Sequence, residues 1–125
     1  MKQTLKINDY EVWVHLGCLS EEQKHAQPVH FTLELNYLKN LSGTHTDNLA
    51  DTTDYVHLVE IIKKTAQKKN YHLIEHLNHE VFIDLISELK KNKASVEARL
   101  TIRKIRVPVE NLKNGVEFSC QMTVS

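Results

Sequence analysis

The spacing of the apolar residues changes along this 125-residue chain, and this change limits the possible folds more than any other feature. Near both ends, apolar side chains recur at every second position, which is typical of half-buried β-strands. Between residues 55 and 91 they recur about every three to four positions, which is typical of amphipathic helices. The sequence therefore predicts the order ββααββ in one α+β domain spanning residues 1–125.

Each of the four predicted strands has apolar side chains on one face and polar side chains on the other. One face of the sheet is therefore apolar, and the two helices are available to cover it. The first two strands most simply form an antiparallel hairpin, with Pro28 at the start of the second. The predicted strands are residues 5–16, broken by a bulge near Asn8 and Asp9, then 29–37, 96–104 and 116–124.

The first predicted helix follows the polar segment Asp51–Asp54, which has the composition of a helix start. Its apolar stripe is broad, because additional apolar residues blur the phase of the pattern. The residues expected near its buried face are Val56, Val59, Ile62 and Ala66.

The second predicted helix, from about Asn70 to Lys91, is the longest helical pattern in the sequence. Glu75 falls in its first turns, so a carboxylate is held where a rigid scaffold meets open space. This position suits a ligand-binding group, although an acidic residue in the first turn also complements the helix dipole. The residues that this helix is expected to bury are Leu73, Ile74, Leu77, Val81, Leu85, Ile86 and Leu89.

Composition excludes several classes of function. Sixteen basic and sixteen acidic residues cancel, so no overall field draws the chain to nucleic acid or to an anionic membrane. No segment approaches the ~18 apolar residues of a membrane span, and the N-terminal segment lacks the apolar core of a signal peptide. Cys18 and Cys120 are too few for a disulfide framework, which favours a reduced, cytoplasmic protein. Partners are expected to be small molecules or proteins.

Lys104 has an unusual position at the end of the third predicted strand. It continues the apolar row of Val96, Ala98, Leu100 and Ile102, so an ammonium group ends a row of inward-facing side chains. The sequence leaves two explanations of this position open. A swap of face at the strand end would place Lys104 in solvent, whereas an inward lysine would be available for chemistry.

Four segments of the chain form an ordered set of motifs: Gly17–Glu22 followed by Gln27, Asp47–Tyr55, Asn70–Leu77, and Ile102–Lys104 with Pro108 beyond. Together they resemble the dihydroneopterin aldolases, which are cofactor-independent aldolases of folate biosynthesis, and the related dihydroneopterin triphosphate epimerases. Any one segment is weak evidence, but all four occur in order at the family's spacing. The resemblance therefore covers nearly the whole chain.

This resemblance implies the tunnelling fold (T-fold), a four-stranded antiparallel sheet with two helices on one face. In such proteins the sheets of several subunits join into a barrel, with pterin sites between neighbouring subunits. The expected state is therefore a homo-oligomer, either a tetramer or an octamer. Such an assembly would also satisfy the unpaired edge strands that so small a sheet leaves.

The resemblance also implies how a pterin substrate is held. Glu75 would accept hydrogen bonds from the 2-amino and ring N–H groups, a pairing that suits the two oxygens of a carboxylate. Backbone groups around Leu73 and Ile74 would complete this anchor. Tyr55 would come from the adjacent subunit, contact the substrate and relay a proton.

The chemistry implied by the resemblance centres on Lys104. This residue would be the acid/base group, acting with water and Glu22 on the side-chain hydroxyls of 7,8-dihydroneopterin. Cleavage of the C1′–C2′ bond would release glycolaldehyde and leave an enamine, which is reprotonated to 6-hydroxymethyl-7,8-dihydropterin. The resemblance thus implies a lyase without cofactor, metal or Schiff base, because the dihydropterin ring takes up the electrons.

Two features depart from the aldolase pattern. His15 is displaced by one position from the histidine of the Gly-Tyr-His-Gly element that aldolases commonly carry, and the loop after Lys104 is not rich in proline. The epimerases share the same polar residues, so dihydroneopterin triphosphate 2′-epimerase is an alternative function. The alternative from another class is a non-catalytic pterin- or purine-binding oligomer. Four intact residues argue against it: Glu22, Tyr55, Glu75 and Lys104.

Eight histidines raise the question of a metal site. His72 and His76 are four residues apart on the predicted second helix, and His79 follows near the same face. Related tunnelling-fold synthases bind zinc through a His-x-His pair on a strand, and this chain has no such pair. We therefore expect these histidines to lie on the surface and the protein to hold no metal.

Overall fold

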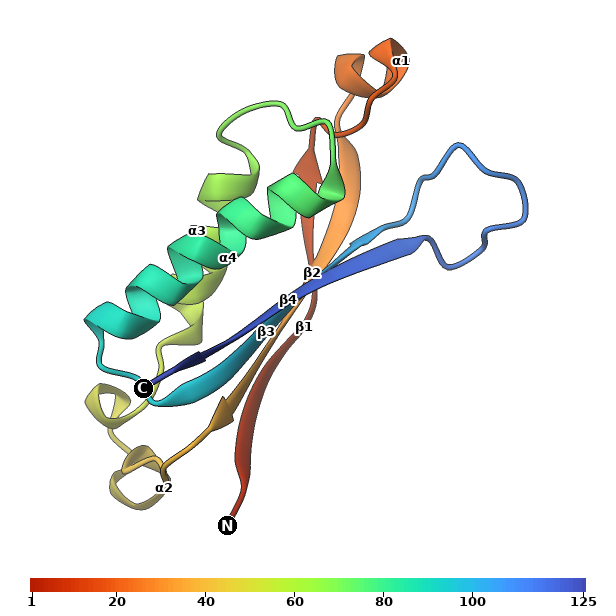
Figure 1. Ribbon diagram of the computed structural model, residues 1–125. Coiled ribbons are helices and arrows are strands. Elements are labelled where there is room, and N and C mark those ends of the chain that lie inside the picture. The colour runs from red at the N-terminus through yellow and green to blue at the C-terminus, as the bar shows by residue number, and fades with distance from the viewer.

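The computed structural model describes every residue from Met1 to Ser125, and its framework is a four-stranded antiparallel sheet (Figure 1). The strands lie side by side in chain order, so each pairs with its neighbour in the sequence. Their bounds are β1 (Gln3–Val14), β2 (Gln27–Tyr37), β3 (Val96–Lys104) and β4 (Val116–Val124). The predicted sheet and the hairpin of the first two strands are confirmed.

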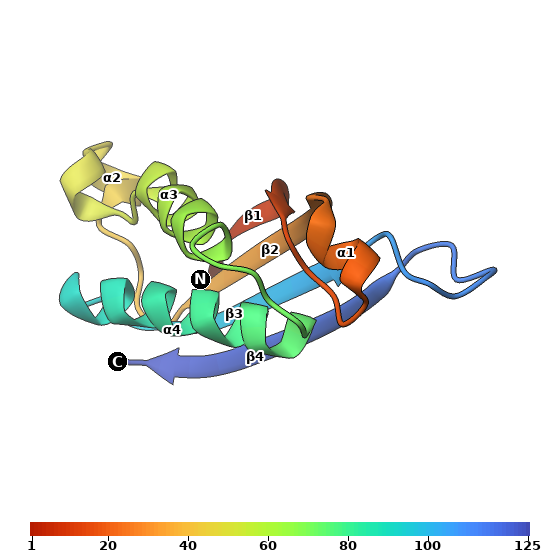
Figure 2. The same cartoon turned by 90° about the horizontal axis from the view of Figure 1, so that it is seen from above.

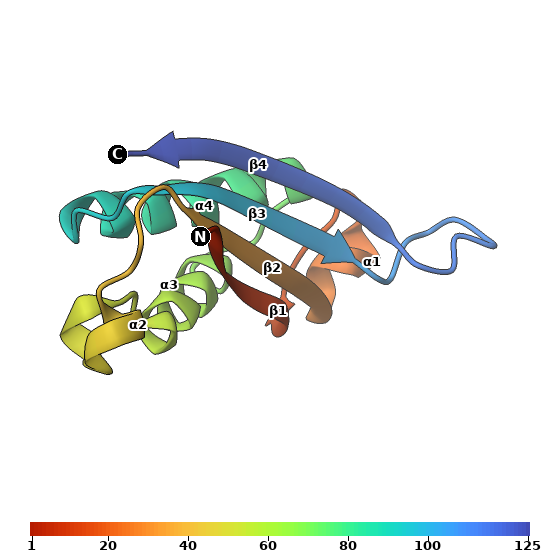
Figure 3. The same ribbon diagram turned by 90° about the horizontal axis from the view of Figure 1, so that it is seen from below.

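Two helices, α3 (Tyr55–Ala66) and α4 (Ile74–Lys91), cover one face of this sheet (Figure 2). The view from below shows the opposite face of the sheet without any covering element (Figure 3). Short helical segments lie in the connections: α1 (Ser20–Lys24), α2 (Gly43–Thr46) and the 3₁₀ turn η1 (Leu49–Asp51). None of the helices combines the length and the apolar character that crossing a membrane would require.

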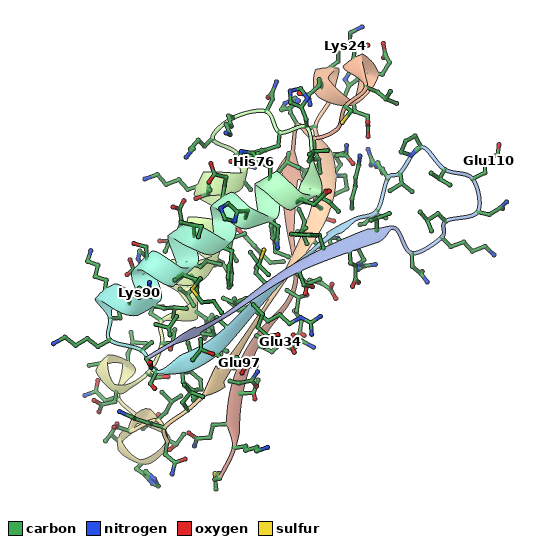
Figure 4. The ribbon with its side chains drawn as sticks, in the orientation of Figure 1. Lys24, Glu34, His76, Lys90, Glu97 and Glu110 are labelled. Atoms are coloured by element: carbon green, nitrogen blue, oxygen red, sulfur yellow. The ribbon has the colours of Figure 1, made fainter.

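The core lies between the sheet and the two helices, as the alternation of apolar residues predicts. Twenty-two buried apolar residues form one cluster, to which all four strands and both helices contribute. On the uncovered face, most side chains are polar, and Glu34 of β2 and Glu97 of β3 point away from the helices (Figure 4). The sheet therefore has one dry face and one face open to solvent or to another subunit.

The predicted bulge near Asn8 and Asp9 is present in β1. The pairing of β1 with β2 shifts between Ile7 and Tyr10, and Asp9 has a left-handed backbone with φ of 47°. The extra residue keeps apolar side chains on the covered face on both sides of the break. Without it, Val12 would face solvent, because a shift of one residue reverses the face of every following side chain.

The start of the second long helix differs from the prediction. Helix α4 begins at Ile74, whereas the periodicity suggested a start near Asn70, and Leu73 is an extended, half-exposed N-cap. The reason is a tertiary contact: Tyr71 donates its N–H to His15 O and accepts from Gly17 N. This bridge to the residues just after β1 holds Tyr71 in a non-helical conformation, so the helix starts after it.

The structure also differs from the prediction in which residues of α3 are buried and in where two strands begin or end. Val56 was expected on the buried face of α3 but is exposed, and Leu58 is buried in its place. Strand β2 begins at Gln27, two residues before the predicted start, while β1 ends at Val14. The polar segment between these strands contains helix α1, which is too short to show a periodic pattern.

Candidate active site

A pocket of about 430 Å³ opens where α1, the start of α4 and the β3–β4 loop meet. Its walls are largely apolar, and three charged side chains interrupt them. An apolar cleft with a few convergent polar groups is the usual form of a small-molecule site. Its lining consists of Gly17, Cys18, Leu19, Glu22, His72, Leu73, Ile74, Glu75, Lys104, Val107, Pro108, Val109 and Val116.

Lys104 ends the inward row of β3, where it pairs in register with Val29 on one side and Val116 on the other. Its side chain is 12 % exposed, and its Nζ lies 2.6 Å from Glu22 Oε2. The face does not swap at the strand end, so the lysine enters the pocket instead of solvent. The structure thereby resolves the alternative that periodicity left open.

Glu22 lies on α1 and reaches across the pocket floor to Lys104. Its other oxygen, Oε1, lies 3.4 Å from the backbone N of Leu19, the N-cap residue of α1. Gly17 makes this position possible, because its φ of 132° suits glycine and because a Cβ there would overlap the Glu22 carboxyl group. The glycine in the first motif therefore creates space for the carboxylate.

The ion pair changes the acidity of Glu22. The hydrogen bond from the Lys104 ammonium holds the pKa of Glu22 below its ordinary value of 4.5. Partial burial of the carboxylate opposes this effect, and the Leu19 backbone N–H adds to it. Glu22 is therefore ionised at neutral pH and remains an acceptor for hydrogen bonds.

Glu75 is the second residue of α4 and lines the same pocket, from a different element than Lys104 and Glu22. Its side chain is exposed and makes no hydrogen bond or ion pair within the chain. The extended backbone of Leu73 turns into the helix at Ile74, next to the free N–H groups of the first turn. A carboxylate without a partner beside an apolar wall is available for a ligand that presents N–H donors.

Tyr55 does not join this cluster within one chain. It is the first residue of α3 and is 57 % exposed. The preceding residue, Asp54, lines a separate hollow with Asn92 at the C-terminal end of α4. Glu75 is at the other end of that 18-residue helix, about 27 Å away by the rise of an α-helix.

The histidines of the second helical segment do not converge. His72 lines the pocket and is exposed, while His76 lies 3.8 Å from Glu80 on the outer surface of α4 (Figure 4). No three His, Cys, Asp or Glu side chains lie together in an arrangement that could hold a metal ion.

Several pocket residues were not expected from the sequence. Cys18 and His72 lie at the rim, joined by a weak contact from Cys18 Sγ to His72 O at 3.5 Å. Val107 and Val109 form a wall from the β3–β4 loop, which departs from the aldolase pattern. The sequence shows that both are apolar, but their position depends on the path of an irregular loop.

Sequence comparison finds relatives over nearly the whole chain. The family model described as dihydroneopterin aldolase matches residues 5–121. A protein of Chlamydia pneumoniae named "probable dihydroneopterin aldolase" is 33% identical over 115 residues, covering 92% of this chain and 84% of its own. A protein of the same name from Chlamydia trachomatis is 31% identical, with coverage of 96% and 95%.

Solved structures show the same fold. Dihydroneopterin aldolase of E. coli in complex with neopterin superimposes with a TM-score of 0.79 at 21% identity, covering 94% of this chain and 98% of its own. The Burkholderia enzyme bound to guanine gives 0.76 at 18% identity, with coverage of 99% and 93%. The subunit therefore has the predicted tunnelling fold. By its sequence match over nearly the whole length, this chain belongs to the dihydroneopterin aldolase family.

Proposed function

We propose that this protein cleaves 7,8-dihydroneopterin into 6-hydroxymethyl-7,8-dihydropterin and glycolaldehyde. The observation that carries this proposal is the pair of Lys104 and Glu22, 2.6 Å apart, in a pocket that the unpaired Glu75 also lines. One pocket thus holds a ring-binding carboxylate and an acid/base pair on different elements. This arrangement matches a substrate with a pterin ring at one end and hydroxyls at the other.

In this proposal Glu75 holds the ring. Neopterin and guanine, the ligands of two structural neighbours, both carry a 2-amino group beside a ring N–H. Those two donors match the two oxygens of one carboxylate. The backbone at Leu73 and Ile74, next to the first turn of α4, would complete the anchor.

Lys104 and Glu22 would then act on the substrate's side chain. Loss of the 2′-hydroxyl proton breaks the C1′–C2′ bond, whose electrons form a C6=C1′ double bond while the π pair of the N5=C6 bond moves onto N5. Glycolaldehyde leaves, and a proton delivered to C1′ completes the product. Because the ring itself receives the electron pair, the reaction requires neither a metal nor a Schiff base.

We further propose that the complete site is shared between subunits of a homo-oligomer. Support comes from the distance of Tyr55 from Glu75 within one chain and from the exposure of Tyr55. The unpaired edges of β1 and β4 offer a way for sheets to join. A cytoplasmic location is supported by two cysteines that remain free.

The proposal is tested by incubating purified protein with 7,8-dihydroneopterin and, separately, with its triphosphate. Glycolaldehyde and 6-hydroxymethyl-7,8-dihydropterin should form in equal amounts from the first. Inversion at C2′ is measured in both, so that an epimerase is recognised. Binding of pterins without either reaction would contradict the proposal and identify a binding protein.

Lys104→Ala should lower kcat by ~10²–10⁴-fold, the usual effect of removing a positioned acid/base group. Affinity for pterin should change far less, because Glu75 lies on a different element. The matched control is Lys24→Ala, since Lys24 pairs only with Glu21 on the exposed side of α1 (Figure 4). Normal turnover by folded Lys104→Ala protein would remove this residue from the mechanism.

A further inference from the structure

We propose that Gln23 is a positioning residue for this reaction: its side-chain amide sets the distance between the Lys104–Glu22 pair and the ring-binding end of α4. The inference rests on the proposed aldol cleavage. Gln23 lies outside the set of residues that line the pocket, so it acts through its neighbours and not on the substrate.

The Gln23 amide connects two segments that are far apart in sequence. Its Nε2 donates to Gly17 O at 2.5 Å and to Tyr71 O at 2.8 Å. An amide nitrogen has two hydrogens, so both donors are used. The Gln23 backbone oxygen also lies 3.1 Å from His15 Nδ1, which places the displaced histidine of the first motif against α1.

One of these acceptors is a fixed point of the fold. Tyr71 is 1 % exposed, and its backbone is held by His15 O and by Gly17 N. Its hydroxyl donates to Thr65 O at 2.8 Å, at the end of α3. A group bound to Tyr71 O is therefore attached to the part of the molecule from which α4 and Glu75 start.

Helix α1, in contrast, has little else to hold it. It consists of five residues, none of which is buried, so apolar packing does not fix its position. Polar contacts of Glu22 and Gln23 attach it to the remaining structure. Since these two residues are consecutive, the Gln23 amide limits how far the Glu22 carboxylate can move from Glu75.

The substrate must contact Glu75 and the Lys104–Glu22 pair at once, so the distance between them affects turnover more than ring binding. Misplacing a reacting group by about 1 Å can lower a rate ~10²-fold. A ligand that contacts only the Glu75 side does not depend on α1. Pterin without a side chain is such a ligand, and it separates the two effects.

The experiment compares kcat for 7,8-dihydroneopterin with calorimetric binding of pterin in the wild type and in Gln23→Leu, Gln23→Glu and Gln23→Lys. Gln23→Leu and Gln23→Glu, which lack the donors, should lose roughly 10- to 100-fold in kcat. Pterin affinity should stay within about threefold. Gln23→Lys, which restores N–H donors of similar reach, should recover most of kcat.

Gln67→Leu is the matched control, because Gln67 Nε2 also donates to a backbone carbonyl, Trp13 O at 3.0 Å, and Gln67 does not line the pocket. It should keep the wild-type kcat. The inference is overturned if folded Gln23→Glu turns over normally, or if pterin affinity falls as much as kcat. A wild type without aldol cleavage would instead contradict the proposed function.

Discussion

Glu22 combines two tasks that place opposite demands on one side chain. It neutralises the most buried ammonium among the ion pairs, with side chains 12 % and 17 % exposed, and it borders the pocket. An ion pair of this kind stabilises the fold only while the carboxylate is ionised. The stability of the protein should therefore depend on pH through this residue.

Glu22→Gln should lower the free energy of unfolding by about 1–3 kcal/mol at about pH 7, because it removes a charge-assisted hydrogen bond from Lys104. The pKa of Glu22 is lowered in the folded state. The stabilisation is therefore complete above the ordinary value of 4.5 and is lost as the pH falls through the folded pKa. Urea unfolding at several pH values and one protein concentration measures the difference.

The control is Glu21→Gln, because Glu21 pairs with Lys24 at 3.0 Å on the exposed surface. Its effect should stay below about 0.5 kcal/mol and should not change with pH in the same way. A loss from Glu22→Gln that is equal at pH values above and below 4.5 would contradict the assigned linkage.

For single residues, the sequence predicts the position of a side chain when that position follows from the regular geometry of a strand or helix. Lys104 lies in the pocket because strand alternation continues to the last residue of β3. Glu75 lies there because helix starts present their first turn to open space. The role of Gly17 was not predictable, because it depends on a contact with Glu22 that forms only in the folded chain.

Among the elements, helix α4 shows where local pattern is sufficient and where it is not. Its interior follows the predicted apolar face from Leu77 to Leu89. Its first residue does not, because the bridge between Tyr71 and Leu16 competes with helix formation over residues 70–73. After its last turn, Lys93 adopts a left-handed backbone conformation, which lysine does not favour.

Lys93 follows α4 with a φ of 57°. Its N–H bonds Lys90 O, and the N–H of Ala94 bonds Leu89 O, which together form a Schellman motif. Glycine adopts this conformation without strain, so Lys93→Gly should raise the free energy of unfolding by about 0.5–1 kcal/mol. Denaturant titration at fixed protein concentration provides the measurement.

Lys91→Gly serves as the comparison, because Lys91 is the last helical residue and has no left-handed backbone. It should destabilise the protein by about 0.5–1 kcal/mol through lost helix propensity. If both substitutions changed stability in the same direction, the φ of Lys93 would not explain its effect.

In the whole molecule, the sheet and its helices were predictable because each element has its own apolar period. The joining of elements into a complete site was not, because Tyr55 and Glu75 lie at opposite ends of the helical layer. No pattern within one chain brings them together. The hypothesis that the site is shared between subunits came from the resemblance to the family. It requires a second subunit, whose Tyr55 would lie near Glu75 of the first.

Co-assembly of two inactive variants tests this hypothesis. Lys104→Ala and Tyr55→Ala each should have very low turnover in a pure oligomer. In mixed oligomers, a site that takes Tyr55 from the first variant and Lys104 from the second contains both native residues. Random assembly of equal amounts makes about a quarter of the sites native, so activity should return to about that fraction of wild type.

The mixed oligomers must be formed by refolding or by co-expression, so that subunits of the two variants assemble together. Preformed oligomers mixed at low temperature, in which subunits have not exchanged, are the control. Mixing Lys104→Ala with Glu75→Gln is a second comparison, because both residues line the pocket of one chain. Each site in that mixture takes both positions from the same subunit, so none is native and activity should not return. Recovery in this pair would contradict the assignment of Lys104 and Glu75 to one subunit. Absence of recovery with Tyr55→Ala would place Tyr55 in the same subunit as Lys104 or outside the site.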